Sequence, residues 1–257
     1  MNYFFGIKSK HIDCEIRIPI FKNNGERIRS PILISCEIKN DMWFLKKLNI
    51  NLKNDFFVLN NDQIDNEKVF FVDDGNFFKA DNIEKGVFLN EIQNFNCLTD
   101  TEPQFRCNLK IYNNTGFSSY QSEYPFKMIE RSGNILSPIY PLLNENSNQN
   151  LIFLKNIYFK PIYEKFDVYL VDIKKMIIIG KYQAVTNKTN EIVIDNKLIK
   201  EDYYIFSQKF IGIPIYVSIY NNAISMEHTH PPHHYILSQD KYKIVSKLKK
   251  KINEIVN

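Results

Sequence analysis

Two short segments near the start of the chain alternate apolar and polar residues, and this period most constrains the fold. The apolar positions are Ile12, Cys14, Ile16, Ile18 and Ile20 in the first segment, and Ile32, Ile34, Cys36 and Ile38 in the second. Side chains alternate between the two faces of a strand, so each segment predicts a β-strand with one buried face. The polar stretch 22–27 between them predicts an antiparallel hairpin with a long loop.

Short apolar segments separated by turn residues continue along most of the chain. The further strand candidates are 56–59, 69–72, 105–112, 151–158, 166–172, 176–184, 192–194, 203–206, 213–219 and 223–227. The 20 Phe and 15 Tyr also favour strands over helices. Many short strands of this kind predict a mainly β fold, an antiparallel sandwich or distorted barrel. One short helix is expected at 42–48, because Asp41 is a favoured N-cap residue.

The C-terminal segment changes period. Apolar residues fall at spacings of four, four and three, at Ile244, Leu248, Ile252 and Ile255. This pattern predicts an amphipathic helix that buries that stripe against the body of the protein and begins near Ser238 or Asp240. Its lysines, residues 247 and 249–251, are expected to face mostly water, with an anionic partner as the alternative.

The length and composition indicate a folded chain. It has 257 residues, of which 44% are hydrophobic and 24% charged, so it can bury a substantial core. We expect a single β-rich domain of residues 1–257. The polar segment 142–150 is a candidate boundary, although a surface loop is the preferred interpretation.

The net charge, the cysteines and the apolar runs indicate which class of protein and which compartment to expect. The net charge of +4 is smaller than expected of a dedicated nucleic-acid binder. The four cysteines form no CxxC pair, and we expect Cys14, Cys36 and Cys107 to be buried as small apolar residues. No apolar run approaches the length of a membrane span, about 20 residues, and the N-terminus does not have the pattern of a secretory signal. The chain is therefore expected to be soluble and cytoplasmic.

A histidine cluster is the first candidate site. Four of the five histidines lie in Glu227-His228-Thr229-His230-Pro231-Pro232-His233-His234. On a strand, His228 and His230 would share a face and could chelate one metal ion, zinc or iron first, then copper or nickel. His233, His234 and Glu227 are the candidates to complete the ligand set. A metal-free acid–base role for His228 and His230, or a structural bend, remain the alternatives.

The second candidate site lies at residues 116–128, read from the sequence as a loop. It groups hydroxyl, amide, carboxylate and aromatic side chains, a mixture typical of ligand-binding loops. The candidate ligand-binding residues are Ser119, Tyr120, Gln121, Glu123 and Tyr124. A carbohydrate or a nucleotide sugar would suit them, and Glu123 is a further acid–base candidate. The alternative is that these residues serve the packing of the protein itself.

The familiar catalytic signatures are absent from the sequence: no GxGxxG, GxxxxGK[ST], GxSxG or HExxH. Three function classes therefore remain open. The preferred one is a β-rich binding or interaction protein for a carbohydrate, another small molecule or a protein partner. The alternatives are a metal-dependent enzyme that uses the histidine cluster and a structural subunit of a larger, oligomeric assembly.

Overall fold

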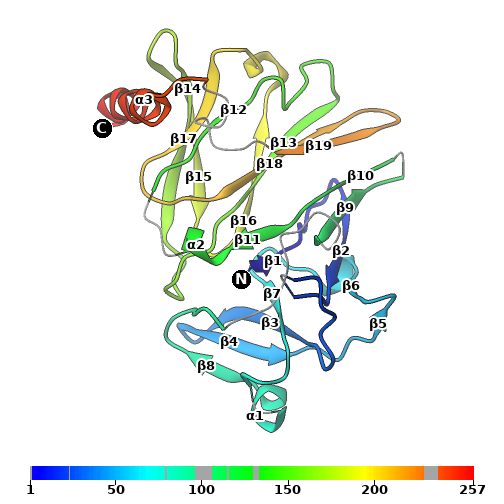
Figure 1. Cartoon of the computed structure of the whole chain (residues 1–257). Coiled ribbons are helices and arrows are strands. Elements are labelled where there is room, and N and C mark those ends of the chain that lie inside the picture. The colour runs from blue at the N-terminus through cyan, green and yellow to red at the C-terminus, as the bar shows by residue number, and fades with distance from the viewer. Residues whose placement is uncertain are drawn as a thin grey trace. The chain divides into compact units, whose positions relative to one another are not determined.

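The computed structural model describes residues 2–22, 24–78, 80–95, 106–114, 116–129, 133–228 and 237–257. It confirms a mainly β protein with a helix at the C-terminus (Figure 1). The described residues form two compact units. Unit 1 comprises residues 1–130, 157–163 and 187–189, and unit 2 comprises the remaining segments, 131–156, 164–186 and 190–257. The segment 142–150 lies within unit 2, and the single-domain interpretation stays a prediction.

Unit 1 contains two sheets. The six-stranded sheet has the order β11 (Glu123–Pro125), β1 (Asn2–Phe4), β7 (Val69–Asp73), β3 (Ile32–Lys39), β4 (Met42–Lys47) and β8 (Val87–Leu89). The five-stranded sheet has the order β10 (Phe117–Tyr120), β9 (Asn108–Tyr112), β2 (Asp13–Pro19), β6 (Phe56–Leu59) and β5 (Leu52–Lys53). Short helices complete the unit, namely η1 (Asn61–Gln63), α1 (Ala80–Lys85) and α2 (Phe126–Ile129).

The two alternating segments form strands, but their predicted pairing is wrong. Strand β2 pairs with β6 and β9, whereas β3 pairs with β4 and β7 in the other sheet. The reason lies at Asn40 and Asp41, whose φ angles are 51° and 57°. Two consecutive left-handed residues make the tight turn that suits a β-hairpin, so the chain returns at once as β4. Asp41 therefore belongs to a turn, and the helix predicted at 42–48 is a strand.

Unit 2 also contains two sheets and the C-terminal helix. One sheet has the order β12 (Leu136–Pro138), β17 (Tyr203–Ser207), β14 (Lys165–Asp172) and β15 (Ile177–Val185). The other has the order β16 (Thr189–Ile194), β13 (Gln149–Lys155), β18 (Ile213–Ile219) and β19 (Ile224–His228). A 3-10 turn, η3, spans Asn196–Leu198. The narrower expectation of a sandwich or barrel stays a prediction.

Helix α3 (Lys241–Val256) forms as predicted, but its buried stripe is rotated from the predicted one. Val245 and Ile252 are buried against Tyr169, Val171 and Phe206 of the first sheet of unit 2. The residues packed around them include Leu248 and Ile255, whereas Ile244 keeps 45% of its surface exposed. Val245 precedes Ile252 by seven residues, close to two helical turns, so these two buried side chains lie on the same face of α3.

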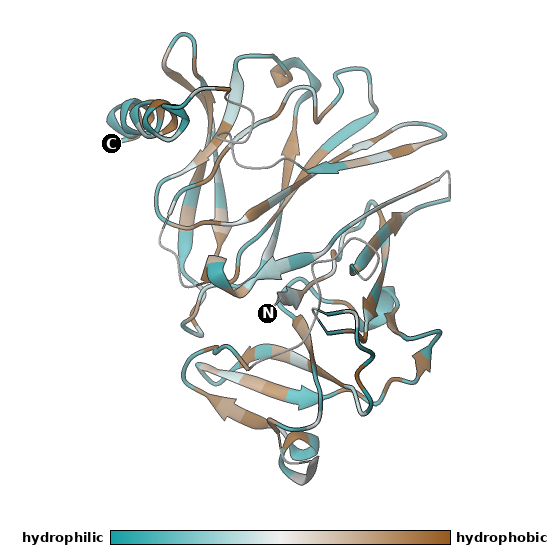
Figure 2. Ribbon diagram, viewed as in Figure 1, coloured by the Kyte–Doolittle hydropathy of each residue, from teal (hydrophilic) through white to brown (hydrophobic). Residues whose placement is uncertain are grey.

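Figure 2 shows α3 as mostly hydrophilic, interrupted by apolar residues. Most side chains of this helix are therefore polar and compatible with exposure to solvent. None of the helices in the described ranges has both the length and the apolar character needed to cross a membrane.

Candidate functional site

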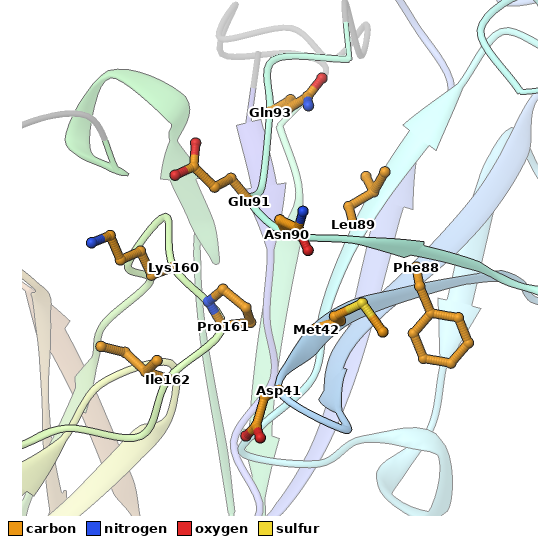
Figure 3. A pocket seen from close by; sticks show the side chains of 10 residues that line it. All are labelled: Asp41, Met42, Phe88, Leu89, Asn90, Glu91, Gln93, Lys160, Pro161 and Ile162. Atoms are coloured by element: carbon orange, nitrogen blue, oxygen red, sulfur yellow. The ribbon is translucent and has the colours of Figure 1, made fainter.

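A hollow on unit 1 has a volume of about 850 Å³ (Figure 3). Three segments far apart in the sequence line it. Its residues are Asp41, Met42, Phe88, Leu89, Asn90, Glu91, Gln93, Lys160, Pro161 and Ile162. Five of these side chains are polar and five are apolar, a mixture that can contact a ligand broadly and also orient it.

The first two walls of the hollow follow from strand pairing. The tight turn at Asn40 and Asp41 places Met42 at the start of β4, and β4 pairs with β8 so that Phe44 lies opposite Phe88. The two rings pack with their centroids 4.8 Å apart. Gly86 leads into β8 with φ 96°, and a Cβ there would lie 2.2 Å from the Phe44 ring. Only glycine suits both that conformation and that contact.

The third wall is the loop 160–162, which belongs to unit 1 although it comes from the second half of the chain. The Trp43 indole N–H donates to the Phe159 carbonyl at 2.9 Å, and the Ile92 backbone N–H donates to the same oxygen at 3.0 Å. One acceptor thus connects strand β4, the segment after β8 and the loop.

A buried amide holds the other side of that loop. The Asn187 side-chain N–H groups donate to the carbonyls of Lys160 and Ile162 at 2.8 and 3.0 Å, and its Oδ1 accepts from Tyr158 N at 2.7 Å. Asn187 is 2% exposed. Buried polar groups are costly unless they are hydrogen-bonded, so this residue fixes the loop in one conformation.

The hollow places apolar side chains next to charged and amide side chains. Phe88 keeps 44% of its surface exposed. Figure 3 shows Glu91 and Lys160 on one side and Met42 and Phe88 on the other. Two carboxylates, two amides and one ammonium group line it, and there is no histidine or cysteine among its lining residues. Within the described ranges, no cluster of three or more His, Cys, Asp or Glu residues can hold a metal ion.

The predicted site at 116–128 is not a loop. It forms β10, β11 and the short helix α2, because its aromatic residues favour strands and pair with β9 and β1. Ser119 lies exposed on β10, at the edge of its sheet, and the neighbouring Tyr120 is half-buried. The Gln121 Oε1 accepts from the Arg106 guanidinium.

Two residues of that segment serve the interior of unit 1. Tyr124 is fully buried, its hydroxyl donates to Ile157 O at 3.4 Å, and burial raises its pKa. Tyr124 thus packs in the interior of unit 1, and its predicted ligand-binding role stays a prediction. The Glu123 carboxylate accepts from Cys107 N at 3.3 Å. None of the five predicted ligand residues lines the hollow of Figure 3.

The histidine cluster lies mostly outside the described residues, since His230, His233 and His234 all fall there. His228 is half-buried at the end of β19, opposite Ile215, and Glu227 is exposed opposite Tyr216. Consecutive strand residues face opposite sides of the sheet, so Glu227 and His228 diverge within β19. The metal and acid–base roles of this cluster stay predictions.

The cysteine prediction is confirmed for the three described residues. Cys14, Cys36 and Cys107 are buried in the core. Burial raises the pKa of Cys14 to about 12 and also raises that of Cys107. Both therefore stay protonated near neutral pH, a state that does not suit a nucleophile.

Sequence reasoning missed the residues of the hollow. The polar run Asn90-Glu91 with Gln93, directly after a short apolar stretch, was the available signal for one wall. Nothing in the sequence indicated that residues 160–162 would join it. Comparison with known proteins adds no family, since no family model, no curated protein and no solved structure matches this chain.

Proposed function

We propose that this protein binds a neutral oligosaccharide in the hollow of unit 1. The observation that carries the proposal is the partly exposed Phe88 ring among acid and amide side chains from three segments. A sugar ring presents apolar C–H groups on its faces and hydroxyls at its rim. An aromatic side chain can pack against the faces, while carboxylates and amides accept from and donate to the hydroxyls.

The charge of the hollow favours a neutral ligand. Asp41 and Glu91 carry negative charge and Lys160 carries positive charge, so the lining is slightly negative. An acidic or phosphorylated sugar would meet net repulsion there, whereas the hydroxyls of a neutral sugar can use both signs as hydrogen-bond partners. The tethered loop adds to the affinity, because a wall that is already ordered loses little entropy on binding.

Isothermal titration with three neutral tetrasaccharides tests the proposal: chitotetraose, maltotetraose and cellotetraose, with sialyllactose as the acidic comparison. We expect at least one neutral sugar to bind with Kd of about 0.1–1 mM. Phe88→Ala should weaken that binding about tenfold.

The control variant is Phe117→Ala, which removes a phenylalanine of the same unit that is 67% exposed and does not line the hollow. Its affinity should equal that of the unchanged protein. Absence of binding by all three neutral sugars at millimolar concentration would rule the proposal out, and so would an equal loss in the two variants.

The other functions that the sequence left open stay proposals with their own readouts. A metal-dependent enzyme using His228 and His230 would contain stoichiometric zinc or iron by elemental analysis of untagged protein. A protein partner or a structural role in an oligomer would appear as a stable complex of higher mass in light scattering. Sugar titration remains the first experiment, because the hollow is built from described residues.

We also propose the narrower fold class for unit 2, a sandwich of its two four-stranded sheets. A hydrogen bond between the two sheets supports this proposal. The hydroxyls of Ser137 in β12 of one sheet and Tyr216 in β18 of the other lie 2.5 Å apart. The side chains of β13 and β18 are almost all buried, as expected of inner strands.

A further inference from the structure

A second hollow lies beside helix α3 in unit 2, with a volume of about 480 Å³. Its lining residues are Asn134, Tyr242, Val245, Ser246, Lys249, Lys250 and Asn253. The Lys249 ammonium donates to Asn134 O at 3.1 Å, which ties the segment before β12 to the helix. The hollow thus has two walls joined by a hydrogen bond.

The outer face of α3 carries uncompensated positive charge. The helix has six lysines and a single glutamate. Lys243, Lys247 and Lys250 are exposed at positions i, i+4 and i+7, so they form one stripe facing away from the buried Val245 and Ile252. At about 1.5 Å rise per residue the stripe extends roughly 10 Å. Salt bridges pair lysines elsewhere on the protein with carboxylates, but none among the described residues involves α3.

The hollow beside the stripe has the chemistry of a base-binding pocket. The Tyr242 ring is 64% exposed and has the Lys241 ammonium over it at 5.5 Å from the ring centroid, so a base that stacks on the ring also meets a positive charge. The amides of Asn134 and Asn253 and the hydroxyl of Ser246 can donate to and accept from base edges. Lys250 belongs both to the hollow and to the stripe, so a ligand lying in one also meets the other.

We infer that α3 and its hollow bind single-stranded nucleic acid, with a base against Tyr242 and the phosphates along Lys243, Lys247 and Lys250. Stacking aromatics beside a positive surface are the recurring means of binding single strands without sequence preference. An anionic membrane fits less well, because an interfacial helix must insert its apolar face and that of α3 is already buried in unit 2.

Fluorescence anisotropy with labelled single-stranded DNA and RNA, each about 12 nucleotides long, tests the inference at about 50 mM salt. The variant Lys243→Glu with Lys247→Glu should lose at least about tenfold in affinity. The slope of log K against log salt concentration should also become less negative by about 1.4, the contribution of two phosphate contacts on a single strand. Tyr242→Leu should weaken binding about fivefold or more without changing that salt dependence.

The matched control is Lys197→Glu with Lys200→Glu, which alters net charge equally at exposed lysines of unit 2 outside the hollow. Its affinity should fall much less than that of the α3 variant. Circular dichroism melting of each variant establishes that it is folded. The inference is overturned by absence of binding to both oligonucleotides, by equal losses in the two double variants, or by binding only to vesicles containing phosphatidylserine.

Discussion

The Trp43 indole N–H donates a hydrogen bond of 2.9 Å to the carbonyl oxygen of Phe159, 116 residues away in the sequence. Trp43 is 1% exposed, so this bond forms in a nearly dry environment. It ties a segment from the second half of the chain to β4, and thereby positions the loop that forms one wall of the proposed sugar site.

Replacing Trp43 by Phe tests that connection. The change removes the donor and part of the buried ring, while the hydrogen bond from Ile92 N to Phe159 O remains. We expect the free energy of unfolding to fall by about 1–3 kcal/mol. Urea denaturation should be followed by circular dichroism, because Trp43 is the single tryptophan and fluorescence is lost with it. An unchanged midpoint would show that the bond contributes little to stability.

Two isoleucines of α3 test the rotation of its buried stripe. Ile252 is fully buried and Ile244 is 45% exposed, so the same change to Ala should have unequal effects. Ile252→Ala should cost about 2–5 kcal/mol, and Ile244→Ala less than about 0.5 kcal/mol. Thermal or urea unfolding measures both. Similar costs at the two positions would instead support the stripe expected from the sequence, which contains both residues.

Alkaline pH should destabilise the protein through Cys14, whose pKa burial raises to about 12 from an ordinary value of 9.0. Above about pH 9 the unfolded chain releases this proton while the folded chain keeps it, so rising pH lowers the free energy of the unfolded state relative to the folded state. Stability should fall as pH rises from about 9 towards 12, by at most about 1.4 kcal/mol per pH unit for this group.

Cys14→Ala removes that titration, so its unfolding free energy should fall less steeply over the same pH range than that of the unchanged protein. Cys107 also has a raised pKa and remains in both proteins, so it contributes equally to the two curves. Urea unfolding at several pH values provides the comparison. If the unfolding free energies of the two proteins fell equally steeply with pH, the Cys14 thiol would not be responsible for the loss of stability.

The sequence by itself determined many of the strand segments, the burial of Cys14, Cys36 and Cys107 and the position of the final helix, but it misassigned β4 as a helix and β10 and β11 as a loop. Local period is sufficient for these features, because the alternation at Cys14 and Cys36 specifies a buried face whatever strand lies beside it. The pairing of strands was beyond its reach. Alternation of apolar and polar residues does not indicate which strand lies beside which. Strand β3 pairs with β4 and not with β2 because the left-handed residues Asn40 and Asp41 form a tight turn between them.

Only the tertiary structure decided which side chains meet. Val245 is buried and Ile244 exposed because α3 packs on its sheet at one particular rotation, which several apolar positions could have allowed. The hollow of unit 1 exists because Phe159 O accepts from Trp43 and Ile92, and because Asn187 binds the loop beside it. Such long-range hydrogen bonds depend on where the folded backbone brings donors and acceptors together, and no local pattern of residues carries that information.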